Sequence, residues 1–178
     1  MINTVNFLFR KFDILILYFE NKKIKGVTMN IKILVGAGDK IILLTLPFIV
    51  GGIVLNILYP HFFQLHLGLI GILIGAVLLA VGIPFWFVSV VQMIRYVPQN
   101  KLITKGAFGV ILHPIYTSVA ILVIPGLGFM FDTWVGLTIG AILYIISRIF
   151  RGQEEKKLNG IFGEEYQTYR SKVLIPWL

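Results

Sequence analysis

Long apolar stretches, separated by short polar segments, make up most of the chain after about residue 40. Four of these stretches approach the ~20 residues that a helix needs to cross a bilayer. They cover residues 41–58, 67–94, 115–131 and 133–150. The pattern therefore predicts an all-α fold, an integral membrane helical bundle with about four transmembrane helices.

Prolines and small residues predict where these helices end, bend and pack. Pro60 ends the first stretch, because proline lacks the N–H that continues a helix. Pro84 predicts a kink in the second stretch. Gly75, one of several small residues at four-residue spacing there, indicates close helix packing. Asp132 and Thr133 form a predicted tight turn, in which either side chain is a candidate N-cap of the fourth helix.

The charged residues support the membrane prediction and orient it. The chain carries 16 Lys and Arg against 8 Asp and Glu, a net charge of +8. The basic residues cluster before the first apolar stretch, after the second and after the fourth, positions that fall on one side of the membrane. The positive-inside rule makes that side the cytosol, with both termini there. Clusters at helix ends fit contact with anionic membrane lipids and argue against a nucleic-acid partner.

The region after the last apolar stretch has helical periodicity. Residues 154–173 predict a cytosolic amphipathic helix, or two helices if Gly163 breaks it. We expect this helix to lie against the cytosolic ends of the spans and to cap a pocket there. Its apolar positions recur at helical spacing and are Leu158, Phe162, Tyr166, Tyr169 and Val173.

The first 28 residues differ in pattern from the rest. Their apolar residues are interrupted by Arg10, Lys11 and Asp13, so no stretch there is long enough to span a bilayer. One interpretation is an interfacial amphipathic helix. The other is a dispensable extension, with translation of the natural product starting at Met29. In both cases residues 29–178 form the single membrane domain.

The chain has no cysteine and only three histidines, which excludes thiol chemistry and argues against a metal site. The remaining chemistry lies in two polar clusters on either side of the last two apolar stretches. One cluster contains His113, Pro114 and Tyr116, and the other contains Glu154 and Glu155. Because the two stretches predict a helical hairpin, both clusters should meet at the same membrane surface, which is the candidate site.

Each of these residues also has a purely structural interpretation. His113 precedes a proline at a helix start, where its ring could satisfy local backbone groups. Arg151 and Glu155 are four residues apart and could form a surface ion pair worth only ~0.3–0.5 kcal/mol. The tyrosines of the tail are equally typical of an interfacial belt.

Several short patterns, taken together and in this order, resemble a known family. They are residues 102–108, His113-Pro114-Ile115-Tyr116, residues 154–158, Phe162-Gly163, Tyr166, Tyr169 and Pro176. In order and spacing they resemble the isoprenylcysteine carboxyl methyltransferase family and its phospholipid methyltransferase relatives. The resemblance covers residues 101–176, and the earlier spans share only the family's hydropathy.

The resemblance implies an integral membrane enzyme that takes S-adenosylmethionine from the cytosol and methylates a lipid-like acceptor from the bilayer. It also implies that the His-Pro-x-Tyr region and the paired glutamates help to enclose this cofactor. S-adenosylmethionine offers an ammonium, a sulfonium, a carboxylate and hydroxyls, so its site needs carboxylate acceptors, donors and an apolar wall. The predicted cofactor-binding residues are Lys105, His113, Pro114, Tyr116, Arg151, Glu154, Glu155 and Tyr169.

The chain departs from the family's usual pattern near the histidine. Leu112 and Gly109 stand where basic residues are common, and Ser118 stands where glycine is common. These changes remove positive charge near the expected cofactor carboxylate, which Lys101 or Lys105 could replace. No residue is an obvious dedicated base, and this favours a carboxylate, which is already ionised at neutral pH, or another anionic acceptor. Among carboxylates, the resemblance implies one such as that of a prenylcysteine.

Two other functions remain open from the sequence. An NADPH-dependent membrane reductase of the sterol reductase type should place several basic residues around the cofactor's extra phosphate. A non-catalytic membrane module would use its polar ends only for anchoring or for binding a partner.

Overall fold

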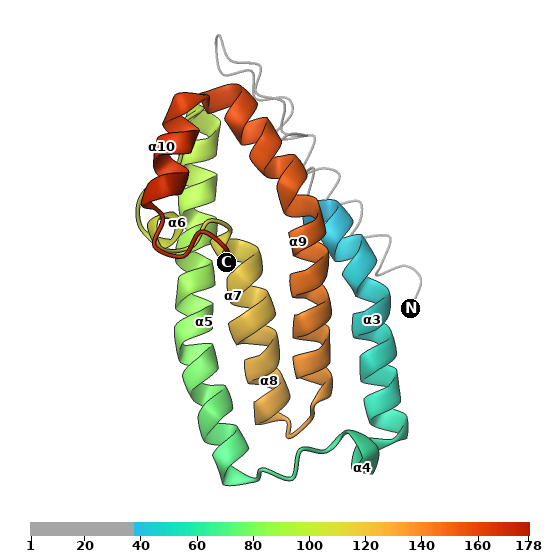
Figure 1. Ribbon diagram of the computed structural model, residues 1–178. Helices are drawn as coiled ribbons and strands as arrows, with labels where there is room; N and C mark the ends of the chain where they lie inside the picture. The colour runs from blue at the N-terminus through green and yellow to red at the C-terminus, as the bar shows by residue number, and fades with distance from the viewer. Residues whose placement is uncertain (1–37) are drawn as a thin grey trace. The chain divides into compact units, whose positions relative to one another are not determined.

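The computed structural model describes residues 38–178, and these contain helices but no β-strand (Figure 1). They belong to one compact unit. The predictions for residues 1–28 and for a start at Met29 lie outside the described residues. The all-α prediction is confirmed for the part of the chain that the structure covers.

Three helices are long and apolar enough to cross a membrane. They are α3 (Gly38–Leu58), α5 (Leu69–Tyr96) and α9 (Val135–Phe162). The first ends just before Pro60, as predicted, and the short helix α4 (Pro60–Phe63) follows it. Helix α5 continues on both sides of Pro84, and a kink there stays a prediction.

The predicted third span is shorter than the others and is built from three pieces. These are α7 (Pro114–Ser118), the π-helical η2 (Val119–Val123) and α8 (Ile124–Met130). Pro125 has no N–H to donate to the carbonyl one turn earlier, and the backbone widens into the π-helix beside it. At 1.5 Å per residue the combined segment is about 26 Å long, shorter than a hydrocarbon core of ~30 Å.

The helices pack side by side in the order α5, α7–η2–α8, α9 and α3 (Figure 1). Glycines allow the backbones to approach closely. A Cβ at Gly75 of α5 would lie 2.6 Å from the carbonyl oxygen of Gly126 in α8. This contact confirms that the small residues of the second stretch serve close packing.

The turn between α8 and α9 agrees in part with its prediction. Helix α9 begins at Val135, and the hydroxyl of Thr133 accepts the N–H of Val135 at 3.3 Å, so the prediction that Thr133 caps the start of this helix is supported. Asp132 does not cap α9, and both side chains also bind other segments, namely the loop before α5 and helix α3. An oxygen of Asp132 accepts the N–H of Leu67 at 3.0 Å, and the hydroxyl of Thr133 donates to Asn56 at 2.7 Å.

The fourth span and the first half of the tail form one helix rather than two. Helix α9 continues without interruption from Val135 to Phe162, and so carries both its apolar residues and the glutamate pair. The predicted break at Gly163 is confirmed, because this glycine has φ = +51° and separates α9 from α10 (Glu164–Lys172). Helix α10 packs back against α9 (Figure 1).

Candidate functional site

His113 lies directly before α7, where Pro114 occupies the first helical turn. Its ring makes no capping hydrogen bond to the helix, although its backbone oxygen accepts the N–H of Thr117 at 3.2 Å. The side chain is only 7% exposed. The structural interpretation, in which the ring satisfies local backbone groups, is therefore not supported.

The imidazole of His113 lies between the two glutamates of α9. Its Nδ1 is 3.7 Å from Oε2 of Glu154, and its Nε2 is 3.5 Å from Oε1 of Glu155. Adjacent helical side chains point about 100° apart, and a planar ring with a nitrogen on each edge fits between them. Because neutral imidazole has a single N–H donor, only the protonated ring can serve both carboxylates at once.

Glu155 has a second partner, but it is not the one that the sequence suggests. Its Oε2 lies 3.3 Å from Nη2 of Arg170, which comes from α10. The possible surface pair between Arg151 and Glu155 does not form in the structure. Instead, Arg151 turns its guanidinium to the backbone oxygen of Trp177, 3.1 Å away.

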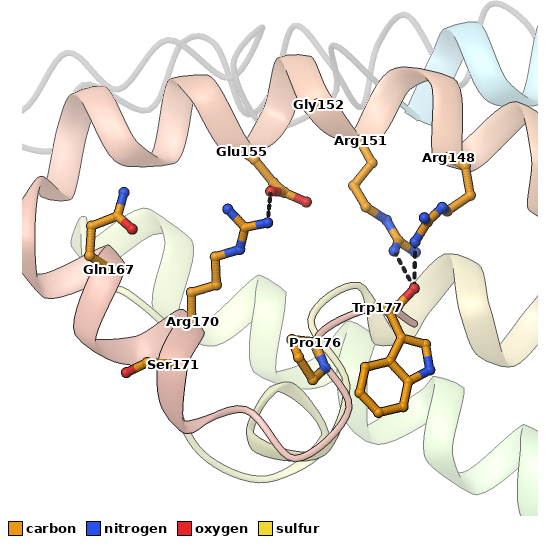
Figure 2. A pocket seen from close by; sticks show the side chains of 9 residues that line it. All are labelled: Arg148, Arg151, Gly152, Glu155, Gln167, Arg170, Ser171, Pro176 and Trp177. Carbon is orange, nitrogen blue, oxygen red and sulfur yellow. Dashed lines mark hydrogen bonds and ion pairs between the residues drawn. The ribbon is translucent and has the colours of Figure 1, made fainter.

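A cavity of about 740 Å³ opens between α9, α10 and the C-terminal segment (Figure 2). This volume is within the ~300–1,000 Å³ typical of small-molecule and cofactor sites. Three arginines and one glutamate give its wall a net positive charge. The lining residues are Arg148, Arg151, Gly152, Glu155, Gln167, Arg170, Ser171, Pro176 and Trp177.

Several buried side-chain atoms lack hydrogen-bond partners, and among them only those of Arg151 belong to a residue that lines the cavity. A buried polar atom without a partner costs ~1–3 kcal/mol, so a cluster of them within residues 38–178 indicates a site prepared for a polar ligand. Burial raises the pKa of Tyr166 to about 12, and the nearby negative charge of Glu155 adds to this effect. The unpartnered atoms are Nε2 of His113, Oγ1 of Thr117, Nε and Nη2 of Arg151, Oε2 of Glu154 and the hydroxyl of Tyr166.

Tyr169 has a structural role in this arrangement. Its hydroxyl donates to the backbone oxygen of Phe108 at 2.8 Å, and its ring lies in an apolar cluster with Leu112, Tyr166 and Val173. Burial raises its pKa. Leu112 is 5% exposed in the same cluster, so a basic residue there would be buried among apolar side chains.

Of the predicted site residues only Arg151 and Glu155 line the cavity, and three others lie outside the His113–glutamate cluster as well. Lys105 is exposed, and its backbone oxygen accepts a hydrogen bond from Gln92 at 3.0 Å. Pro114 is buried at the start of α7. Tyr116 packs against a cluster that includes Ile41, on the side of α3 and α9.

Sequence reasoning missed several residues that line the cavity, and two of them make contacts that shape the site. Arg170 belongs to the tail, where nothing in the local pattern links it to Glu155. Trp177 contributes its backbone oxygen, which leaves no signal in the sequence. Arg148 was recognisable, because it lies one turn before Arg151 on the charged side of α9.

The structure thus brings together His113, Arg151, Glu154 and Glu155 from the predicted set. Comparison of the chain with protein-family models, curated proteins and solved structures finds no match.

Proposed function

We propose that the chain is an integral membrane methyltransferase that uses S-adenosylmethionine and acts on a lipid-like acceptor. The observation that carries the proposal is the placement of His113 between Glu154 and Glu155, beside an arginine-lined cavity in an apolar helical bundle. A charged residue in such a bundle is costly and usually has a function.

The residues present fit the charges of this cofactor. Glu154 has a buried carboxylate oxygen without a partner, suited to accept hydrogen bonds from an ammonium group or from ribose hydroxyls. Arg151 has two buried nitrogens without partners, suited to a carboxylate. Buried donors and acceptors side by side favour a zwitterionic ligand over a purely anionic or purely apolar one.

The bound cofactor supplies an activated methyl group, and the chain's own residues orient the two reactants. Positioning alone can lower the barrier of such a transfer by several kcal/mol. An acceptor carboxylate needs no base, which agrees with the pairing of Glu155 to Arg170 and His113 rather than to an open position. The exposed apolar side chains of α3 and α5 fit an acceptor that arrives from the bilayer.

One observation favours a second candidate, an NADPH-dependent reductase. Positive charge is scarce next to His113 in the sequence, but Arg148, Arg151 and Arg170 line the cavity. Several arginines are what the extra phosphate of NADPH requires. The two candidates differ in the charge of the ligand, which makes them separable by direct binding.

Calorimetry of the purified full chain in detergent, with S-adenosylmethionine and with NADPH in parallel, tests the proposal. We expect saturable binding of S-adenosylmethionine and a tenfold to hundredfold loss in His113→Ala, since a hydrogen bond to a charged group contributes ~1.5–3 kcal/mol. The matched control is His61→Ala, an exposed histidine of α4. Binding of NADPH alone favours the reductase, and binding of neither favours a non-catalytic module.

A further inference from the structure

The chain beyond Val173 forms a strap, which we define as residues 174–177. The N–H of Leu174 donates to the oxygen of Gly109 at 3.2 Å, and the N–H of Ile175 donates to the oxygen of Val110 at 2.9 Å. An isolated parallel bridge joins Ile175 to Ile111. The strap therefore lies along the segment that leads into His113, and its last two residues line the cavity.

The backbone oxygen of Trp177, at the end of the strap, accepts hydrogen bonds from two arginines of α9. Nη1 of Arg148 lies 2.5 Å from the backbone oxygen of Trp177, and Nη1 of Arg151 lies 3.1 Å from the same oxygen. Figure 2 shows both side chains converging on this one atom. Among the described side chains neither guanidinium forms an ion pair. Two positive charges thus share a single neutral acceptor.

This arrangement leaves Arg151 poorly satisfied. Arg151 is only 6% exposed, and its Nε and Nη2 have no hydrogen-bond partner. A guanidinium binds carboxylate and phosphate through two parallel hydrogen bonds, and such charge-assisted bonds are about twice as strong as neutral ones. The oxygen of Trp177 therefore occupies a position that an anionic group would fill better.

The strap is held mainly by hydrogen bonds rather than by apolar packing. Leu174 is 70% exposed and Trp177 is 64% exposed, so little apolar surface keeps them in place. Val173, by contrast, is buried in the cluster with Tyr166 and Tyr169. The strap can leave the arginines by rotation after Val173, without disturbing that cluster.

We propose that the strap closes the arginine site in the absence of ligand and is displaced by the carboxylate or phosphate group of an entering ligand. This inference deepens the proposed function by adding a regulatory step at the same cavity. It needs only an anion at Arg148 and Arg151, so inorganic phosphate can test it separately from the methyltransferase proposal.

Variants of the full chain can loosen or lock the strap while both arginines stay intact. Ile175→Pro removes the N–H that donates to Val110, and Ile175→Ala is its matched control because it keeps that N–H. The pair Ile111→Cys and Ile175→Cys can form a disulfide, because bridged neighbours lie within the ~4.4–6.8 Å Cα separation that a disulfide spans. The chain has no native cysteine that could interfere.

Calorimetry with inorganic phosphate and with S-adenosylhomocysteine measures the effect. Loss of one backbone hydrogen bond should raise the open fraction, and with it the apparent affinity, roughly twofold to tenfold in Ile175→Pro. Ile175→Ala should bind like the parent. The oxidised cysteine pair should bind at least about tenfold more weakly, and reduction should restore the parental affinity.

The outcomes separate the two proposals. Strap-dependent binding of phosphate without binding of either adenosyl compound supports the strap and refutes the methyltransferase. Equal affinities in the loosened, parental and locked forms would mean that the strap is a fixed wall. Absence of anion binding in every form, including Ile175→Pro, would also overturn the inference.

Discussion

Replacement of each neighbouring glutamate by glutamine should produce two different defects. Glutamine keeps the size of the side chain and removes its charge. Glu155 contacts both His113 and Arg170, at 3.5 and 3.3 Å, whereas Glu154 has only His113 near it, 3.7 Å from its buried Oε2, which is too far for a hydrogen bond. We therefore predict that Glu155 mainly holds α10 against α9 and that Oε2 of Glu154 accepts a hydrogen bond from the ligand.

The expected size of each effect follows from exposure. The side chains of Glu155 and Arg170 are 18% and 49% exposed, so solvent screens their pair and its loss should cost only about 1 kcal/mol. For a chain of 178 residues this corresponds to a fall in Tm of ~2–4 °C. Glu154→Gln should leave Tm unchanged and weaken S-adenosylmethionine binding about tenfold to hundredfold, through loss of a charged acceptor.

Thermal unfolding in detergent and calorimetry on the same preparations check both values. The control is Glu164→Gln, an exposed carboxylate in the first turn of α10. If Glu154→Gln lowers Tm while Glu155→Gln alone weakens binding, the assignment of roles is reversed. If both variants match the parent in Tm and in affinity, the two carboxylates are merely a solvated helix segment and the site hypothesis fails.

Three further predictions test the fold and the limits of the site. Tyr169→Phe removes the hydrogen bond to Phe108 and should lower the free energy of unfolding by ~0.5–1.5 kcal/mol with unchanged cofactor affinity. A loss of affinity without a loss of stability would mean that the Tyr169 hydroxyl binds the cofactor. Phe131→Cys, at an exposed position beside the α8–α9 turn, should react with an impermeant maleimide from outside intact cells, and reaction only after permeabilisation would contradict cytosolic termini. A chain that starts at Met29 should insert and bind cofactor normally by the same assays, and weakened binding would assign residues 1–28 a role.

The apolar pattern predicted most of the architecture, because length and lack of charge decide which segments can cross a bilayer. The pattern did not reveal details that depend on backbone geometry or on tertiary contacts. The helix predicted over residues 115–131 is present as one apolar helix over residues 114–130, but its π-helical turn beside Pro125 was not predicted. The contacts of Asp132 with Leu67 and of Thr133 with Asn56 join segments that are far apart in the chain, which sequence spacing cannot reveal.

The sequence predicted the part of the candidate site that depends on the hairpin of the last two apolar stretches. His113 and the glutamate pair meet because α7 and α9 are neighbours, as a hairpin requires. The partner of Glu155 was not predictable. Spacing of four residues suggested Arg151, but Gly163 turns the chain back and brings Arg170 within reach, which frees Arg151 for the strap.

The positions of the arginines also account for the departures near the histidine. Leu112 lies in the apolar cluster beneath α10, and the oxygen of Gly109 holds the strap through Leu174. A charge at residue 112 would be buried among apolar side chains without a partner, at a cost of several kcal/mol. Positive charge enters the cavity instead from α9 and α10, through Arg148, Arg151 and Arg170. A ligand anion would therefore find its positive partners on α9 and α10, in the cavity that the end of the strap lines, and not at residues 109 and 112.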